Sequence, residues 1–140
     1  MSNPALLEAM NEQLAAEYQA LIMYIHYAAV VVGPYRPELF NFFTAEIVGE
    51  TLHAQYLADK ISAYGGDPTT TPLPVLHATD AKELLEYVLE AEIAAIAAYA
   101  NIIKLADEAG EIGLRVQMEN FLQDETHHRD ETMKILRSWK

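Results

Sequence analysis

The sequence has 140 residues, of which 51% are hydrophobic, and this is enough for one domain with a substantial core over residues 1–140. It contains no cysteine, which excludes disulfide bonds, thiolate metal sites and thiol nucleophiles. Its formal net charge of -12 argues against binding to nucleic acid or to an anionic membrane. Any metal site must therefore use oxygen and imidazole ligands.

No segment of the sequence is predicted to enter a membrane. The longest strongly apolar run, residues 21–32, is too short to span a bilayer, and the N-terminus lacks the basic region that opens a signal peptide. We therefore expect a soluble, cytoplasmic protein with no membrane partner.

Four segments repeat apolar residues with the spacing of an α-helix, and no segment resembles a strand. Start and stop signals place these helices at about residues 4–32, 37–64, 80–109 and 111–138. Residues 67–79 hold three prolines and four threonines, which is typical of an extended connection. Short turns within each pair and this long crossover between the pairs predict an all-α four-helix bundle made of two antiparallel hairpins.

One pattern of polar residues occurs twice in the sequence. In each copy a glutamate is followed by a tyrosine seven residues later and, 33 residues later, by the glutamate of a Glu-x-x-His motif. The two copies consist of Glu17, Tyr24, Glu50 and His53, and of Glu92, Tyr99, Glu125 and His128. Each predicted hairpin therefore carries one copy.

The glutamates and histidines of both copies fall on the apolar faces of their helices, at about 100° of rotation per residue. Four buried carboxylates without counter-charge would each cost several kcal/mol, and a domain stabilised by about 5–15 kcal/mol could not absorb this. Lys and Arg are absent from the matching faces of the first three helices, so metal ions are the simplest counter-charge. Carboxylate and imidazole ligands favour iron or manganese. The sequence therefore predicts a site for two metal ions, with the ligands Glu17, Glu50, His53, Glu92, Glu125 and His128.

The other aromatic and imidazole side chains have weaker assignments. Tyr24 and Tyr99 are candidates to hydrogen-bond a metal-bound carboxylate or to donate an electron during oxygen reduction, and simple core packing is the alternative. His26, His77 and His127 do not share a helical face with the motif residues. We assign them to the surface, to the crossover or to contacts between subunits.

The two copies together resemble the bacterioferritins, a branch of the ferritin-like superfamily. The segment Glu17-Tyr18-Gln19-Ala20-Leu21-Ile22-Met23-Tyr24 resembles their first helix, and Glu50-x-x-His53, Glu92 and Asp124-Glu125-x-x-His128 follow in the family's order and spacing. This is the ligand set of ferritin-like di-iron and di-manganese proteins. The resemblance covers nearly the whole chain and implies that the six ligands bind two iron ions, with Glu50 and Glu125 as bridges.

The sequence also departs from the bacterioferritin pattern. Thr51 stands where those proteins place the methionine that binds haem, so we expect no haem between subunits. The short fifth helix of the large ferritin cages has no counterpart before Lys140, which argues against a 24-subunit shell. The first helix is apolar nearly all round over residues 20–32, which favours a homodimer or a higher homo-oligomer.

These features lead to three hypotheses about function. The leading one is a ferroxidase that oxidises Fe(II) with O2 or H2O2 and stores or detoxifies iron as bacterioferritins do. The second is a peroxide-reducing or oxygenase-type di-metal enzyme that resembles rubrerythrin and stores no mineral. The third is a stress protein of the Dps type, which is disfavoured because the ligand set lies within one chain and the N-terminal region is acidic.

Overall fold

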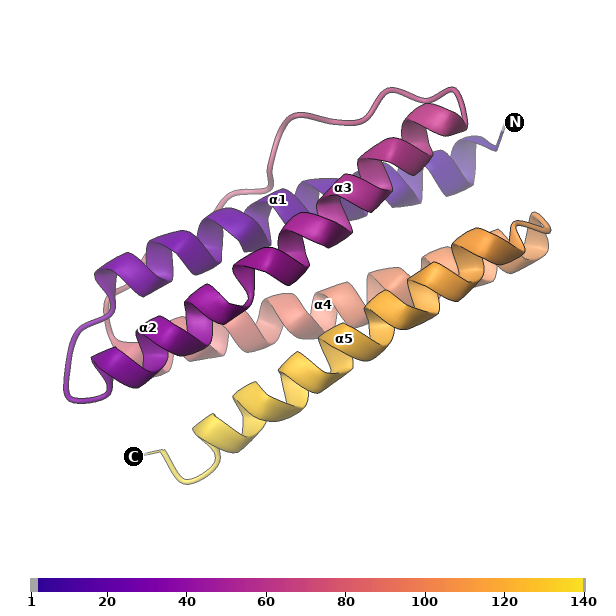
Figure 1. Cartoon of the computed structure of the whole chain (residues 1–140). Coiled ribbons are helices and arrows are strands. Elements are labelled where there is room, and N and C mark those ends of the chain that lie inside the picture. Colours follow the sequence, from indigo (N-terminus) through magenta and orange to yellow (C-terminus); the bar gives the residue numbers. More distant parts are fainter. Residues whose placement is uncertain (1–2, 140) are drawn as a thin grey trace.

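Four long rods of helix run side by side in the computed structural model, which describes residues 3–139 (Figure 1). The helices are α1 (Pro4–Val30), α2 (Arg36–Ala45), α3 (Ile47–Ala63), α4 (Ala81–Glu108) and α5 (Ile112–Leu136). The described residues contain no strand, and none of their helices combines the length and apolarity needed to cross a bilayer. The predicted bundle of two antiparallel hairpins joined by a long crossover is confirmed, with α2 and α3 together forming its second rod.

The start and stop signals read from the sequence act at the helix ends. Asn3 caps α1, since its Oδ1 accepts a hydrogen bond from the backbone N–H of Leu6 at 3.1 Å. Asp80 caps α4 in the same way through the N–H of Glu83 at 3.2 Å. The side chain of Glu83 accepts from the Tyr87 hydroxyl at 2.7 Å. Gly110 follows the end of α4 with a φ of 73°, a conformation that glycine adopts without strain.

The second rod is bent, whereas the sequence predicted one continuous helix. The bend lies at Glu46, whose N–H donates to the carbonyl of Phe43, three residues earlier, at 3.2 Å. The Thr44 hydroxyl donates back to the carbonyl of Phe40 at 2.9 Å, a bond that commonly bends helices. The prediction was wrong here because a threonine inside an apolar helical pattern leaves the period unchanged.

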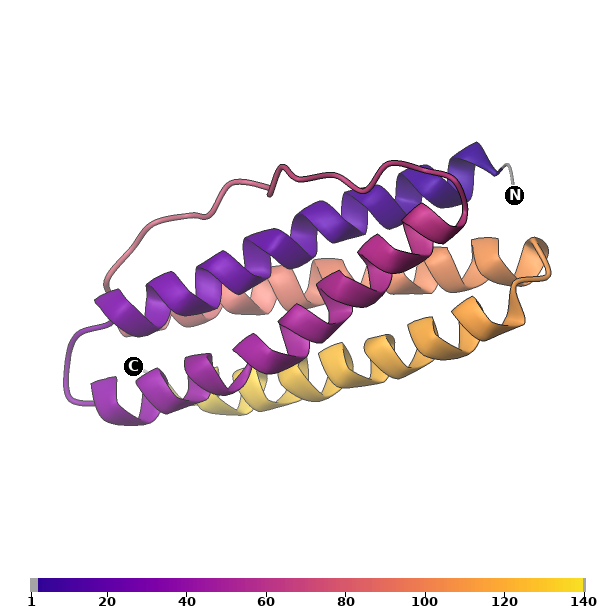
Figure 2. The same cartoon turned by 45° about the horizontal axis from the view of Figure 1, so that its top comes forward.

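Residues 67–79 form an extended strap along the outer side of α1 (Figure 2). Its backbone is fixed at several points: the N–H of Leu73 donates to the Ala15 carbonyl at 3.1 Å, and the Tyr27 hydroxyl donates to the Leu76 carbonyl at 2.7 Å. The strap carries the chain back along the bundle, so that α4 runs antiparallel to α1.

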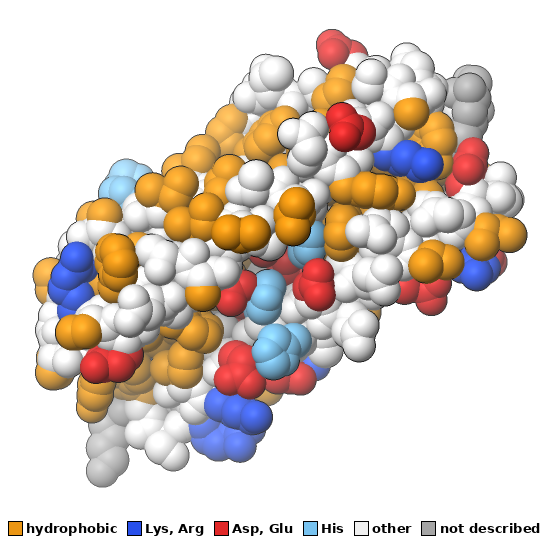
Figure 3. Space-filling view, in the orientation of Figure 1, with side chains coloured by type: hydrophobic (Ala, Val, Ile, Leu, Met, Phe, Trp, Pro, Cys, Tyr) orange, Lys and Arg blue, Asp and Glu red, His pale blue; other side chains and the backbone are white. Residues whose placement is uncertain are grey.

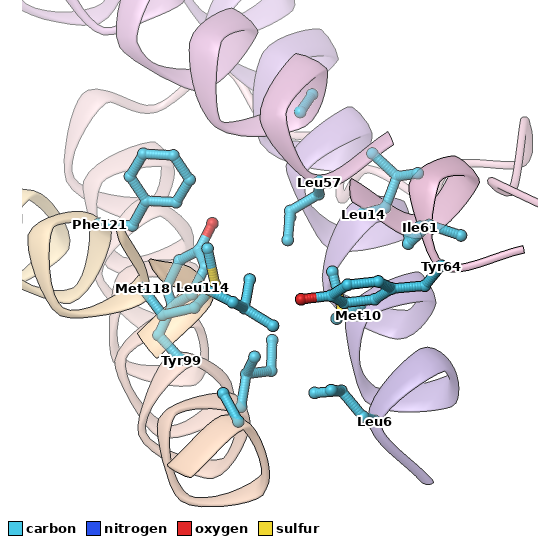
Figure 4. Packing of buried hydrophobic residues seen from close by; sticks show 13 residues of the cluster. Leu6, Met10, Leu14, Leu57, Ile61, Tyr64, Tyr99, Leu114, Met118 and Phe121 are labelled. Carbon is cyan, nitrogen blue, oxygen red and sulfur yellow. The ribbon is translucent and has the colours of Figure 1, made fainter. Parts of the chain in front are cut away.

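The core consists of two apolar clusters, one toward each end of the bundle. The first is built on Leu6, Met10, Leu14, Leu57, Ile61, Tyr99, Leu114, Met118 and Phe121, which point inward from four helices (Figure 4). The second is built on Tyr24, Tyr27, Val31, Phe43, Leu84, Leu85 and Val88. The buried glutamates belong to neither cluster and lie at levels of the helices between them.

Arg36 stabilises the connection between α1 and α2, and its substitution tests this role. Its guanidinium Nη1 donates to the carbonyls of Val31 at 2.7 Å and Ala28 at 3.0 Å, at the end of α1. Because charged hydrogen bonds to otherwise unpaired carbonyls stabilise a protein, we expect Arg36→Ala to lower the free energy of unfolding by about 1–3 kcal/mol in urea denaturation.

The matched control is Arg129→Ala, because within residues 3–139 the guanidinium of Arg129 pairs only with the neighbouring Asp130. This variant should change the free energy of unfolding by less than about 0.5 kcal/mol. Equal effects of the two substitutions would contradict the capping role of Arg36.

Candidate metal centre

The four rods each present predicted ligands to one buried region at the middle of the bundle. The ligands come from α1 (Glu17), α3 (Glu50 and His53), α4 (Glu92) and α5 (Glu125 and His128). Five of them are 1–3% exposed, and His128 is 17% exposed. The Glu-x-x-His spacing puts the acid and the imidazole of each motif one helical turn apart on the same face.

The ligand atoms form two groups that share Glu50. One group consists of Glu17, Glu50, His53 and Glu125, whose nearest ligand atoms all lie within 4.8 Å of one another. The other consists of Glu46, Glu50 and His128 at the same spacing. Two neighbouring groups with a common carboxylate are the arrangement that a pair of metal ions needs.

Glu92 is the one predicted ligand that lies outside both groups. Its Oε2 accepts a hydrogen bond from the Tyr24 hydroxyl at 3.4 Å. Burial raises its pKa to about 8, so the carboxyl group is mainly protonated at neutral pH. Glu92 nevertheless lines the same cavity as Glu17, Glu50 and Glu125.

Each of the six predicted ligands has one buried polar atom without a hydrogen-bond partner. These atoms are Glu17 Oε2, Glu50 Oε1, His53 Nδ1, Glu92 Oε1, Glu125 Oε1 and His128 Nδ1. Among the other described residues, only Tyr64 has a buried polar side-chain atom without a hydrogen-bond partner, its hydroxyl oxygen. A buried polar atom without a partner is costly, and six such atoms in one place fit the coordination of metal ions.

Outer partners hold both imidazoles with the free Nδ1 toward the carboxylates. The Nε2 of His53 lies 3.1 Å from Asp124 Oδ2, and the Nε2 of His128 lies 2.7 Å from Glu46 Oε2. The ring of Phe121 stacks on that of His53, with centroids 4.0 Å apart. A carboxylate on the far nitrogen is typical of metal-binding histidines, because it fixes the tautomer and the ring orientation.

The two repeated tyrosines bond across the bundle to the glutamate of the other copy. The Tyr99 hydroxyl of α4 donates to Glu17 on α1, and the Tyr24 hydroxyl of α1 donates to Glu92 on α4. This exchange follows from the antiparallel packing of α1 and α4, in which equal seven-residue spacings face each other. Gln13 also donates to Glu17, at 2.8 Å.

The acids and imidazoles shift one another's ionisation. Burial and the carboxylates of Glu17 and Glu125 raise the pKa of Glu50 well above its ordinary value. Burial opposes charge on His53 and His128, but the nearby carboxylate of Glu125 and other carboxylates raise both pKa values to about 10. Burial would also raise the pKa of Glu125, but the two nearby imidazoles lower it to about 2. Protons thus neutralise much of the charge in the metal-free site.

The sequence did not assign a role to Glu46 or Gln13. Glu46 lies one turn before Glu50 and reaches His128 from the bend between α2 and α3, and that bend was not predicted. Gln13 lies one turn before Glu17, so its helical spacing was a usable signal.

Imidazole and acidic side chains gather at the surface in the trough between α3 and α5 (Figure 3). Glu46 and His128 contribute partly exposed groups there, and Asp124 is 56% exposed. The candidate metal centre is therefore close to solvent on this side and is bordered by groups that attract cations.

Comparison with known proteins gives results that agree with this geometry. Residues 7–140 match the family model of the ferritin-like domain. A bacterioferritin of Streptomyces coelicolor is 30% identical over 129 residues, which are 91% of this chain and 77% of that protein. A ferritin-like, diiron-carboxylate protein of Bacillus anthracis has a solved structure with a TM-score of 0.95 and 44% identity, covering 98% of this chain and 100% of that one.

A Dps structure from Thermosynechococcus elongatus has a TM-score of 0.90 over 98% of this chain and 93% of that one. Its identity is 18%, so the likeness concerns the fold alone. The family model covers nearly the whole sequence, and the relatives span the bundle from α1 to α5. The chain therefore belongs to the ferritin family, with a ferritin-like domain formed by its four-helix bundle.

Proposed function

We propose that this protein is a ferroxidase that binds two Fe(II) ions in the candidate metal centre and oxidises them with O2 or a peroxide. The six unpartnered ligand atoms at the middle of the bundle are the observation that carries this proposal. The likeness to bacterioferritins and to a diiron-carboxylate protein supports iron as the metal, and manganese is the alternative.

The proposed roles follow the two groups of ligand atoms. Glu17 and His53 would hold one ion and His128 the other, with Glu50, which belongs to both groups, placed to serve both ions and Glu125 as a further ligand. Glu92 lies outside both groups and would complete the second site from the wall of the same cavity. The Tyr24 and Tyr99 hydroxyls keep Glu92 and Glu17 oriented. Each Fe(II) loses one electron, and the oxidant takes up two electrons and two protons. The Fe(III) product is stored or passed on, and this limits the toxicity of iron.

Removing one carboxylate charge tests the role of the centre. We expect Glu125→Gln to slow Fe(II) oxidation by about 100-fold or more, because even the outer partners of metal ligands typically contribute 10- to 100-fold. The measurement is the absorbance rise of Fe(III) after Fe(II) is mixed with the protein in aerated buffer.

Glu119→Gln on the same helix is the matched control, since Glu119 is exposed and pairs with Arg115. It should oxidise Fe(II) at the rate of the unmodified protein. Full activity in Glu125→Gln would refute the proposal, and anomalous scattering at the iron and manganese edges would identify the metal acquired during expression.

The proton-bearing acids and imidazoles predict a pH dependence of the metal-free protein. The pKa values of Glu50, Glu92, His53 and His128 are raised in the folded state. The unfolded chain releases protons from the acids above about pH 4.5 and from the imidazoles above about pH 6.5, whereas the folded state keeps these protons to higher pH. The free energy of unfolding should therefore fall from about pH 5 to about pH 8. The opposite effect of Glu125, whose pKa is about 2, operates only below its ordinary value of 4.5.

Urea denaturation with a chelator at these two pH values measures this dependence. Co(II), which needs deprotonated ligands, should stabilise the protein more at the higher pH and so offset the fall. Glu92→Gln should make the metal-free dependence shallower. A metal-free protein that gains stability over this range would contradict the assigned shifts.

Exposed apolar side chains on the α1–α3 hairpin support a homodimer or a larger homo-oligomer. Val48 and Leu52 lie one turn apart on α3 and are 69% and 63% exposed, and Ile25 on α1 is 53% exposed. Such a set is typical of surfaces covered by a partner.

We expect Leu52→Glu to convert the assembly into monomers, because a charge in an apolar contact must be desolvated. Light scattering coupled to gel filtration measures the mass. Glu90→Gln, an exposed position on α4, is the control, and an unchanged mass in Leu52→Glu would exclude this face from the interface.

A further inference from the structure

A cavity of about 230 Å³ between α1 and α4 reaches from the surface to the carboxylates of the metal centre. We call it the α1–α4 slot. Exposed Glu12 lies at its outer end, and neither His53 nor His128 lines it. Six small side chains line its walls, namely Ala16, Ala20, Ala91, Ala94, Ala95 and Ala98, together with the larger Met23, Tyr24 and Leu73 and the amide side chains of Gln13 and Gln19. The slot exists because alanines on both helices leave space that larger side chains would fill.

The inner end of the slot is polar and unsatisfied. Four carboxyl groups line it, and each is at most 3% exposed and has an oxygen without a hydrogen-bond partner; they belong to Glu17, Glu50, Glu92 and Glu125. A molecule in the slot would therefore have apolar walls along its body and the metal-binding groups at one end.

The strap forms part of the rim of the slot. Leu73 lines the cavity, and its backbone N–H is held by the carbonyl of Ala15 at 3.1 Å. The side-chain amide of Gln19, which also lines the slot, donates to the carbonyl of Pro74. Two hydrogen bonds, at Leu73 and Pro74, thus fix the rim, and the Leu73 side chain adds apolar surface to the slot.

The slot and the α3–α5 trough offer different chemistry to incoming molecules. The trough presents Glu46, Asp124 and His128, whose oxygens and nitrogens can replace the water around a cation. Alanine methyl groups offer no ligands, and apart from Glu12 at the outer end the slot gives a cation only the amide groups of Gln13 and Gln19 before the buried carboxylates. Cations are favoured through the trough, and a neutral molecule with an apolar body is favoured in the slot.

We propose that the α1–α4 slot binds a small alkyl hydroperoxide, ROOH, as the oxidant of the centre, an inference that rests on the ferroxidase function proposed above. O2 and H2O2 are little larger than water, which takes up about 30 Å³ in the liquid, and do not need a slot of this size. The neutral hydroperoxide avoids repulsion by Glu12 and by the net charge of -12. Its O–O bond is cleaved as two Fe(II) give up one electron each, and two protons complete ROH and water.

Substitutions that fill the slot and leave every predicted metal ligand unchanged test this proposal. Ala16→Leu from α1 and Ala98→Leu from α4 each add bulk to its wall, and Ala97→Leu is the matched control, because Ala97 is exposed on α4 outside the slot. Anaerobic stopped-flow measurements compare Fe(II) oxidation by tert-butyl hydroperoxide and by H2O2. We expect each slot variant to lower the ratio of the two rate constants by about tenfold, and the control to leave it unchanged.

Two further measurements distinguish an effect of the substitutions on the slot from an effect on the metal centre. Co(II) absorption should show the same binding stoichiometry in all variants, and saturation-transfer NMR should detect tert-butanol on the metal-free protein and on Ala97→Leu but not on the slot variants. An unchanged ratio, or tert-butanol binding that survives in both slot variants, would overturn the inference. An unmodified protein that binds no Co(II) and oxidises no Fe(II) with any oxidant would instead overturn the ferroxidase proposal.

Discussion

The burial of four carboxyl groups and two imidazoles between two apolar clusters is the constraint on which the rest of the structure depends. Such a set is tolerable only if positive charge compensates it. In the metal-free protein that compensation comes from protons, which is why the pKa of Glu92 is about 8 and those of His53 and His128 are about 10. Protons leave one buried oxygen or nitrogen of each predicted ligand without a hydrogen-bond partner, and these are the atoms that a metal ion would bind.

The internal repeat explains how two hairpins build one site. Because α1 and α4 are antiparallel, a tyrosine seven residues after the glutamate on one helix meets the glutamate of the other, as the bonds from Tyr24 to Glu92 and from Tyr99 to Glu17 show. A shift of either helix by one turn would break both bonds at once. The repeat therefore sets the relative position of the two hairpins along the bundle axis, in addition to placing the polar residues.

Much of this arrangement could be predicted from the sequence, because helical periodicity and Glu-x-x-His spacing are local properties. The helices, the crossover and the burial of Glu17, Glu50, Glu92 and Glu125 follow from them. The contact of Glu46 with His128 could not be predicted, since it depends on a bend produced by side-chain bonding at Thr44 and on the packing of α2 and α3 near α5. The position of Glu92 outside the two groups of ligand atoms could not be predicted either, because helical periodicity places a side chain on a face but does not set its rotamer, which here brings Glu92 Oε2 to the Tyr24 hydroxyl.

The path of the crossover gives the two open sides of the centre different properties. The strap returns along α1, and its Leu73 borders the cavity between α1 and α4. The strap does not cover the trough between α3 and α5, where Asp124 is 56% exposed. The candidate metal centre is thus bordered by charged groups on one side and by alanine methyl groups on the other. Apolar substitutions along the alanine wall change neither the buried carboxyl groups nor their hydrogen-bond partners, so this fold can alter the size of the molecules that reach the candidate metal centre without altering its polar groups.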